Sequence, residues 1–250
     1  MKTNIVNFAK KLLFTVLAMP VAAMASTTVH LDKAPVNVKD QESLQRGASV
    51  FVNYCLNCHS ANYMRYNRMQ DFGLTEQQIK DNLLFAAEKP GETMKIAMRP
   101  KEAKAWFGAT PPDLTVISRS RGADWVYTYL CGFYRDDTRP TGWNNVVFDK
   151  VGMPHVLQEL QGHQVPVMKT VKGGDGHEHQ VIDHLALVKP GKITQAEYDA
   201  LVGDLVNYLA WMGEPAQTQR KNVGLAVLFF LGIFYVVAFY LKREFWKDVH

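Results

Sequence analysis

Two cysteines and a histidine stand together at residues 55–59, which read Cys-Leu-Asn-Cys-His. Cys-x-x-Cys-His is the attachment signature of a c-type heme. The two thiols add to the two vinyl groups on one edge of the porphyrin, and the adjacent histidine becomes an axial ligand of the iron. The sequence therefore predicts one covalent heme c, with Cys55 and Cys58 as thioethers and His59 as the proximal ligand.

Two other kinds of site use similar residues, a thioredoxin-like redox pair and half of a zinc site. A redox pair has no use for the histidine, and it needs a βαβ setting that the surrounding sequence lacks. A structural zinc ion needs a second Cys or His pair at suitable spacing. The heme prediction is therefore preferred to both.

The heme motif needs a helix to deliver it, and residues 40–54 predict one. Asp40 can cap the start of this helix, which runs directly to Cys55. Gly47 would let a second helix approach closely. The apolar or small positions recur at spacings of three and four, at Leu44, Gly47, Ala48, Phe51 and Tyr54.

Residues 194–213 predict the partner helix. Thr194 and Glu197 form a capping box at its start, and Gly213 ends it. Crossed helices from the two ends of a domain around a heme describe a cytochrome c core, so we expect a mainly α fold with long loops. The apolar stripe of the second helix comprises Leu201, Leu205, Tyr208, Leu209 and Met212.

The second axial ligand decides the class of function. A methionine thioether opposite the histidine favours the ferrous state and raises the reduction potential, whereas a vacant face suits gas binding or peroxide chemistry. Met153 is favoured because it stands in a long loop between Gly152 and Pro154, which permit a tight, stiff turn. Spacing alone leaves Met168 open, in a predicted strand, and Met94 and Met98, in a predicted short polar helix or turn.

The remaining methionines of the domain are disfavoured as ligands. Met64 and Met69 lie too close to His59 in sequence to reach across the ring. Met212 belongs to the packing stripe of the last helix. Other methionines would fill gaps in the core, as methionine commonly does.

Both ends of the chain carry segments that are typical of export and membrane insertion. Residues 1–25 combine three lysines, an apolar run and Ala23-Met24-Ala25, which predicts a signal peptide cleaved after Ala25. Residues 222–241 are uncharged and would span about 30 Å as a helix, the hydrocarbon thickness of a bilayer. A buried core helix is the alternative for them. We expect an exported domain at residues 26–221, a membrane helix at 222–241 and a cytoplasmic tail at 242–250.

The net charge of +4 belongs to these end segments. The signal contributes +3 and the tail +1, while residues 26–221 carry 22 bases and 22 acids. The apparent basicity therefore gives no reason to expect binding to nucleic acid. A composition of 47% hydrophobic and 21% charged residues excludes disordered and collagen-like chains, and three cysteines are too few for a disulfide scaffold.

The order of several motifs resembles the cytochrome c1 family, the heme subunit of the cytochrome bc1 complex, in its proteobacterial form. The resemblance covers nearly all of residues 40–250. Besides the heme motif, it rests on MRP at 98–100, PPDLTVI at 111–117, DWVYTYLCGFY at 124–134, GMP at 152–154 and DLVNYLAWMGEP at 204–215.

The resemblance implies roles for particular residues. Met153 would be the distal ligand, so that His59 and Met153 bind the iron. Arg99 would lie near a heme propionate, although a solvated surface arginine is the alternative. A carbonyl of the Pro111-Pro112 loop, which we assign to Pro112, could accept a hydrogen bond from the N–H at Nδ1 of His59 and so orient the ring. The alternative is that this loop is a plain structural turn.

The resemblance also implies the function. The chain would accept one electron from the Rieske iron-sulfur protein, beside cytochrome b in the inner membrane, and pass it to a soluble or tethered cytochrome c. It would not be catalytic alone, and the complex would be dimeric. Two alternatives are a tethered monoheme carrier or oxidase subunit outside the bc1 complex, and a heme peroxidase or gas sensor.

For three further features we expect structural roles rather than chemistry. Aromatic residues between 106 and 134 would seal the heme pocket, most of them as core. Cys131 has no cysteine left to pair with, and we expect a buried small hydrophobe. Residues 164–171 and 181–188 predict a β-hairpin whose histidines, His177, His179 and His184, could bind a metal but more often would not.

Overall fold

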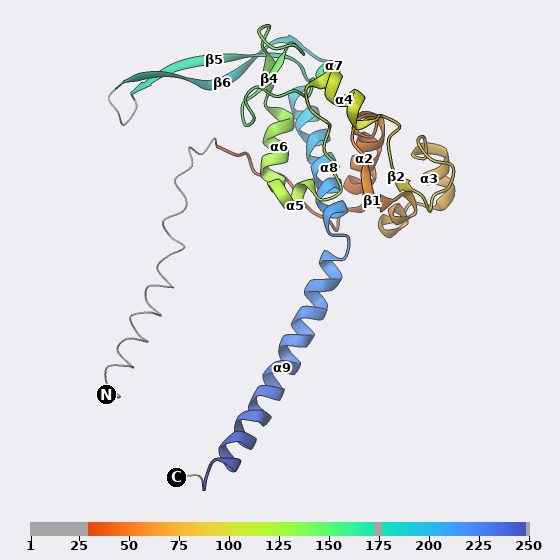
Figure 1. Ribbon diagram of the computed structural model, residues 1–250, viewed down its shortest axis with the longest axis vertical. Coiled ribbons are helices and arrows are strands. Elements are labelled where there is room, and N and C mark those ends of the chain that lie inside the picture. Colours follow the sequence, from red (N-terminus) through yellow and green to blue (C-terminus); the bar gives the residue numbers. More distant parts are fainter. Residues whose placement is uncertain (1–29, 173–176, 249–250) are drawn as a thin grey trace. The chain divides into compact units, whose positions relative to one another are not determined.

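The computed structural model describes residues 30–172 and 177–248. The predicted signal peptide, the tip of the predicted hairpin at residues 173–176 and the last two residues of the predicted tail lie outside the described residues. Within them the fold is mainly helical with small antiparallel sheets, and this confirms the expected fold class (Figure 1).

The first described helix delivers the heme motif. Helix α2 (Gln41–Val50) begins after Asp40, whose carboxylate accepts the backbone N–H of Ser43 at 3.0 Å. It continues into a π-helical turn, η2 (Phe51–Cys55), in which the N–H of Leu56 bonds to the carbonyl of Phe51 at 2.9 Å. The predicted helix is therefore present, but its last turn is wider than an α-helix. Such turns are frequent at functional sites, because they displace the residues that follow.

The predicted partner helix is also present as α8 (Gln195–Gly213). The hydroxyl of Thr194 accepts the N–H of Glu197, and the Glu197 carboxylate accepts the N–H of Thr194 at 2.8 Å. The capping box is therefore complete, and the helix ends at Gly213 as predicted.

Helices α2 and α8 cross at Gly47. A Cβ atom added there would lie 2.0 Å from the backbone oxygen of Asp204 and 2.8 Å from the Cβ of Tyr208. No side chain fits in that space, which explains why the crossing needs glycine. Beside the crossing, Nε of Arg46 donates to Oδ2 of Asp204 at 2.6 Å.

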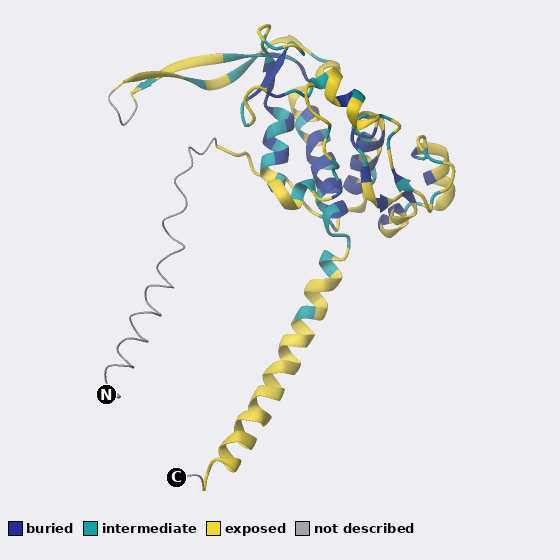
Figure 2. Cartoon of the chain, in the orientation of Figure 1, coloured by how far each residue is buried: buried dark blue, intermediate teal, exposed yellow. Residues whose placement is uncertain are grey.

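Helix α6 (Ala123–Cys131) packs against α8 on the side away from α2 (Figure 1). The hydroxyl of Tyr198 donates to the carbonyl of Leu130 at 2.9 Å and ties the two helices together. Figure 2 shows that buried side chains concentrate along these helices. Each fully buried aliphatic or aromatic side chain contributes about 1.5–3 kcal/mol. The largest include Tyr66, Tyr198, Tyr208, Phe51 and Phe72.

Shorter elements connect these helices. Strand β1 (Ala61–Arg65) pairs with β2 (Thr93–Met94), and β3 (Phe133–Arg135) pairs with β4 (Trp143–Asn145). The prediction of a helix or turn at Met94 was wrong, because this side chain is fully buried beneath Tyr208 and its backbone pairs with Ala61. The remaining short helices are η3 (Tyr66–Phe72), α3 (Glu76–Asn82), α4 (Pro100–Phe107), α5 (Ile117–Arg121) and α7 (Gln158–Gln161).

The predicted hairpin is present and longer than expected, with β5 (Gly162–Lys172) paired to β6 (Glu178–Pro190). Most of its residues are exposed or half-buried (Figure 2). His184 Nδ1 lies 2.9 Å from a carboxylate oxygen of Asp183. No group of three or more His, Cys, Asp or Glu side chains in the described residues could hold a metal ion, so nothing there supports a metal site on the hairpin.

Helix α9 (Gln217–Phe245) is 29 residues long, with a mean hydropathy of 2.5 in its most apolar window. It is long and apolar enough to cross a membrane, and it extends beyond the predicted residues 222–241 at both ends. None of its residues is buried, and this is the opposite of what a core helix would show (Figure 2). Its apolar side chains, such as Phe229 and Tyr235, are 73% and 69% exposed.

Gly47→Ala should destabilise the domain by about 2–3 kcal/mol, because the added methyl must push α2 and α8 apart. This loss outweighs the gain of about 1 kcal/mol that alanine brings to a helix interior. Chemical denaturation of the purified holoprotein, followed by far-ultraviolet circular dichroism, measures the change.

Gly91→Ala is the matched control, since nothing lies within 4 Å of a Cβ at Gly91. Its stability should stay within about 0.5 kcal/mol of the unmodified protein. Equal stability of the two variants would show that the crossing of α2 and α8 tolerates a methyl group at residue 47, and would contradict the prediction.

Candidate functional site

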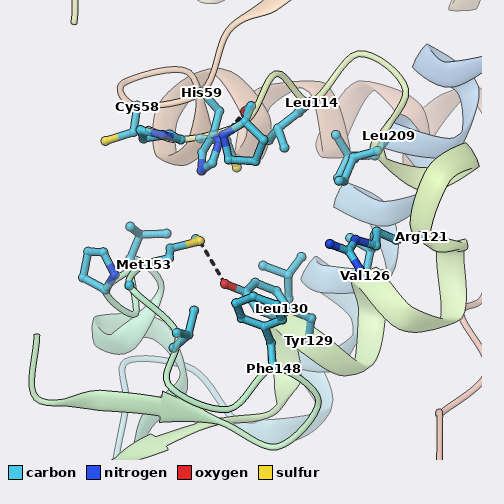
Figure 3. A pocket seen from close by; sticks show the side chains of 18 of the residues that line it. Cys58, His59, Leu114, Arg121, Val126, Tyr129, Leu130, Phe148, Met153 and Leu209 are labelled. Carbon is cyan, nitrogen blue, oxygen red and sulfur yellow. Dashed lines mark hydrogen bonds between the residues drawn. The ribbon is translucent and has the colours of Figure 1, made fainter. Parts of the chain in front are cut away.

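A cavity of about 330 Å³ lies among η2, the loop before α5, helices α6 and α8, and the loop before α7. Its volume falls within the roughly 300–1,000 Å³ of small-molecule and cofactor pockets. Its walls are mostly apolar, with Leu114, Ile117, Val126, Leu130, Leu205 and Leu209 among them. Cys55, Cys58, His59, Pro112 and Met153 line the same cavity, so the structure brings five of the six predicted site residues together (Figure 3).

The two cysteines lie on one tight turn. The N–H groups of Cys58 and His59 both donate to the carbonyl of Cys55, at 3.1 and 2.9 Å. Burial raises the pKa of the Cys55 thiol to about 12 and also raises the pKa of Cys58. A dithiol redox pair needs a thiolate with a lowered pKa. The environment therefore disfavours the redox pair that the spacing alone allowed.

His59 is oriented through its Nδ1 atom, which lies 2.7 Å from the carbonyl oxygen of Pro112. When Nδ1 donates this hydrogen bond, the lone pair on Nε2 is free to bind a metal. Burial lowers the pKa of His59, against an opposing contribution from the Pro112 hydrogen bond, and so favours the neutral ring. The carbonyl expected from the Pro111-Pro112 loop is therefore that of Pro112.

Asp113 helps to hold the loop that carries this carbonyl. Its side chain accepts the N–H of Asn62 at 2.8 Å and the N–H of Thr115 at 2.9 Å. The N–H of Leu114 also donates to the carbonyl of Ser60 at 2.9 Å. The bonds to Asn62 and Ser60 fasten the proline loop to the segment that follows His59.

Met153 enters the cavity from the side opposite His59, and Figure 3 shows the two side chains facing each other across it. The loop is held on both sides of the methionine. Val151 is buried against Phe133 and Trp143, and the His155 ring stacks on Phe133 at 4.8 Å. Two buried neighbours therefore fix the backbone that carries the thioether.

The other candidate methionines lie elsewhere. Met94 is buried in the core, where its sulfur lies 3.7 Å from the hydroxyl of Tyr208. Met168 is 48% exposed on the hairpin. Met98 is half-buried and does not line the cavity. Met153 is the only methionine among the described residues that line the cavity.

The structure places Arg99 outside the cavity. It stands at the N-cap of α4, its side chain is 77% exposed, and it pairs with Glu102. Arg121 instead is the only lysine or arginine among the described residues that line the cavity. Its guanidinium lies 5.1 Å from the centroid of the Trp125 ring, a cation–π distance. Sequence reasoning missed Arg121, although it stands three residues before the start of the aromatic segment at residue 124.

The aromatic segment does form part of the cavity wall. Trp125, Tyr129 and Phe107 line the cavity, while Phe133 is buried behind it and Trp106 is 63% exposed. The hydroxyl of Tyr129 donates to Sδ of Met153 at 3.4 Å.

Cys131 is half-buried at the end of α6. Burial raises the pKa of its thiol to about 12, so it is not a reactive thiolate at physiological pH. The sequence predicts a buried small hydrophobe here; the unreactive thiol agrees with this expectation, but the residue is only half-buried.

The residues present fit a covalently attached heme. Two thiols lie on one turn, a nitrogen donor and a sulfur donor face each other, and most of the wall between them is apolar. A neutral imidazole and a thioether are the ligands of cytochromes c. The cation Arg121 at the cavity suits the negative charge of a propionate.

Comparison with known proteins supports the same conclusion. Residues 32–249 match the model of the Cytochrome C1 family. The chain is 49% identical over 236 residues to cytochrome c1 of Allochromatium vinosum, covering 94% of this chain and 96% of that protein. It is 49% identical over 242 residues to a protein of Nitrosomonas europaea named ammonia monooxygenase gamma subunit, covering 96% and 98%. Cytochrome c1 of Rhodospirillum rubrum is 30% identical over 240 residues, covering 84% and 83%.

Proposed function

Because the chain belongs to the cytochrome c1 family, we propose that it is the heme subunit of a quinol:cytochrome c oxidoreductase. In this role it accepts one electron from a Rieske iron-sulfur protein and passes it to a soluble or tethered cytochrome c. Members of the family carry a covalently bound heme c. One observation carries the proposal. His59 and Met153 face each other across a cavity that Cys55 and Cys58 also line (Figure 3).

Each residue has a distinct role in the proposal. Cys55 and Cys58 hold the heme through thioether bonds. His59 and Met153 bind the iron, and the carbonyl of Pro112 keeps Nδ1 of His59 protonated and the ring in one orientation. When bound, the heme supplies one-electron chemistry at its iron.

Two protein ligands leave no coordination position for a substrate. The chain therefore supplies a fixed position and a tuned potential for outer-sphere electron transfer, rather than catalysis of its own. The apolar wall excludes water and lowers the local dielectric constant, so that each charge near the cavity acts strongly on the potential.

The membrane topology follows from the two end segments. We propose that the signal peptide exports residues 26–221 to the periplasm, that α9 anchors them in the inner membrane, and that residues 242–250 lie in the cytoplasm. The exposed apolar surface of α9 supports the anchor. An anchor beside cytochrome b would shorten the search of the mobile Rieske domain for the heme edge, and the assembled complex would be a dimer.

The alternatives make different demands on the site. A peroxidase or gas sensor needs a vacant or labile distal position, and the placement of Met153 argues against it. The name of the Nitrosomonas europaea protein raises an oxygenase role, which would need an open metal site. Among residues 30–172 and 177–248 no group of three or more His, Cys, Asp or Glu side chains could hold a metal ion, so no observation favours that role.

Met153→Leu should abolish the low-spin spectrum and lower the potential by about 100 mV, a modest part of the roughly 0.8 V that axial ligands span. Redox titration and absorption spectra of the purified holoprotein measure both. The reduced variant should also bind carbon monoxide, whereas the unmodified protein should not.

Met168→Leu is the matched control, because Met168 is an exposed methionine on the hairpin. Its spectrum and potential should be unchanged. A Met153→Leu protein that stays low-spin at an unchanged potential would remove Met153 as the ligand.

Arg121→Gln should lower the potential by some tens of millivolts, because the lost cation no longer offsets propionate charge and the ferric state gains stability. Two unit charges about 10 Å apart interact with about 1–2 kcal/mol at an effective dielectric constant of about 20, and about 59 mV corresponds to 1.4 kcal/mol for one electron. Arg99→Gln removes an arginine outside the cavity and should leave the potential unchanged. The reverse ranking in redox titration would restore Arg99 as the propionate partner.

Mild detergent extraction of an affinity-tagged chain should co-purify a cytochrome b and a Rieske protein in equal amounts. Spectroscopy and mass spectrometry identify them. This experiment separates the proposal from a tethered monoheme carrier or oxidase subunit. Recovery of the chain alone with full electron-transfer activity, or with oxidase subunits, would contradict the assignment to a quinol-oxidising complex.

A further inference from the structure

A hydrogen bond reaches the sulfur of Met153 from the wall of the cavity. The hydroxyl of Tyr129, on α6, donates to Sδ of Met153 at 3.4 Å, and Figure 3 marks the contact with a dashed line. We infer that Tyr129 is a positioning residue that holds the thioether of Met153 toward the iron and raises the reduction potential through this bond. The inference rests on the proposed role of Met153 as the distal ligand.

The Tyr129 ring has little freedom to move. It stacks on Trp125 with a centroid distance of 5.0 Å and an interplanar angle of 12°, and it meets Phe133 edge to face at 5.0 Å. Its backbone carbonyl also accepts a hydrogen bond from Nδ2 of Asn145 at 2.7 Å. The hydroxyl is therefore fixed by three neighbours that do not touch its oxygen.

The side chain of Met153 needs such a constraint, because the contacts of the loop hold only its backbone. Val151 and His155 are 3% and 2% exposed and fasten the loop on either side of Met153. The Met153 side chain itself has three rotatable bonds and is half-buried. A donor at the sulfur selects one of its rotamers, so the rigidity of α6 is passed to the ligand atom.

The chemistry of sulfur allows both contacts at once. A thioether has two lone pairs, so that one can bind the iron while the other accepts the hydroxyl proton. Burial raises the pKa of Tyr129, which keeps the hydroxyl protonated and able to donate. In a mostly apolar cavity a hydrogen bond is stronger than in water.

The direction of the effect on the potential follows from electron density. A donor at the sulfur withdraws density from the thioether and makes it a poorer donor to the ferric iron. The ferric state loses more stability than the ferrous state, so the potential rises. Hydrogen bonds to metal-bound sulfur tune potentials in the same way in other metalloproteins.

Tyr129→Phe tests the inference, because it removes the hydroxyl and keeps the ring stacked. In redox titration of the purified holoprotein, the ratio of ferrous to ferric protein at a fixed ambient potential should fall about tenfold, which is about 59 mV for one electron. The long-wavelength charge-transfer band of a methionine-ligated ferric heme should persist with a shifted maximum.

Tyr198→Phe is the matched control. Its hydroxyl, on α8, donates to the carbonyl of Leu130 on α6 at 2.9 Å, so the variant loses a buried hydrogen bond to the helix that carries Tyr129 without changing a contact of Met153. Its potential and its charge-transfer band should equal those of the unmodified protein. Thermal unfolding of both variants measures the structural cost of each lost hydroxyl.

The outcomes are distinguishable. An unchanged potential and band position in Tyr129→Phe, with the methionine band present, would overturn the inference and leave Tyr129 as a wall residue. Equal potential shifts in Tyr129→Phe and Tyr198→Phe would overturn it too, since the shift would then follow from loss of packing. A methionine band missing from the unmodified protein would instead refute the ligand role of Met153, and with it the proposed function.

Discussion

The structure depends on holding His59 and Met153, which are 94 residues apart in the chain, on opposite sides of one cavity. Neighbouring groups orient the ligands of a metal site, and each of these two side chains is held by a different part of the fold. Helix α2 and its wide last turn position the backbone of His59, and the hydrogen bond to the carbonyl of Pro112 orients its ring. Met153 is positioned by a loop that packs into the core at Val151 and His155.

The helix crossing at Gly47 supports both sides of the cavity. It brings α2, which ends at the heme motif, against α8, whose Leu205 and Leu209 form part of the cavity wall. Helix α6 then packs on α8 and contributes Tyr129 to the opposite wall, where its hydroxyl meets the sulfur of Met153. In the proposed function packing and potential are therefore coupled, because the core helices that stabilise the domain also position the groups around the two proposed ligands.

Much of the fold and half of the site could be predicted from local sequence. The Cys-x-x-Cys-His motif, the caps at Asp40 and Thr194, the need for glycine at 47 and the apolar helix near the C-terminus all depend on short-range patterns. The strand at Met94 was missed because its partner at Ala61 lies more than thirty residues away. No local signal distinguished Arg121 from Arg99, since each lies at the end of a short helix of ordinary composition, Arg99 at the N-cap of α4 and Arg121 as the last residue of α5.

By itself, the sequence determined the cofactor chemistry and the helices that flank it, because the covalent attachment needs two cysteines and a histidine at one fixed spacing and helices follow from caps and periodicity. Only the tertiary structure decided which arginine lines the cavity and which hydroxyl reaches the sulfur, and it placed Met153, which the sequence already favoured, across the cavity from His59. These are contacts between segments distant in the chain. Their geometry is set by how helices and loops pack together, and no local pattern of residues encodes it.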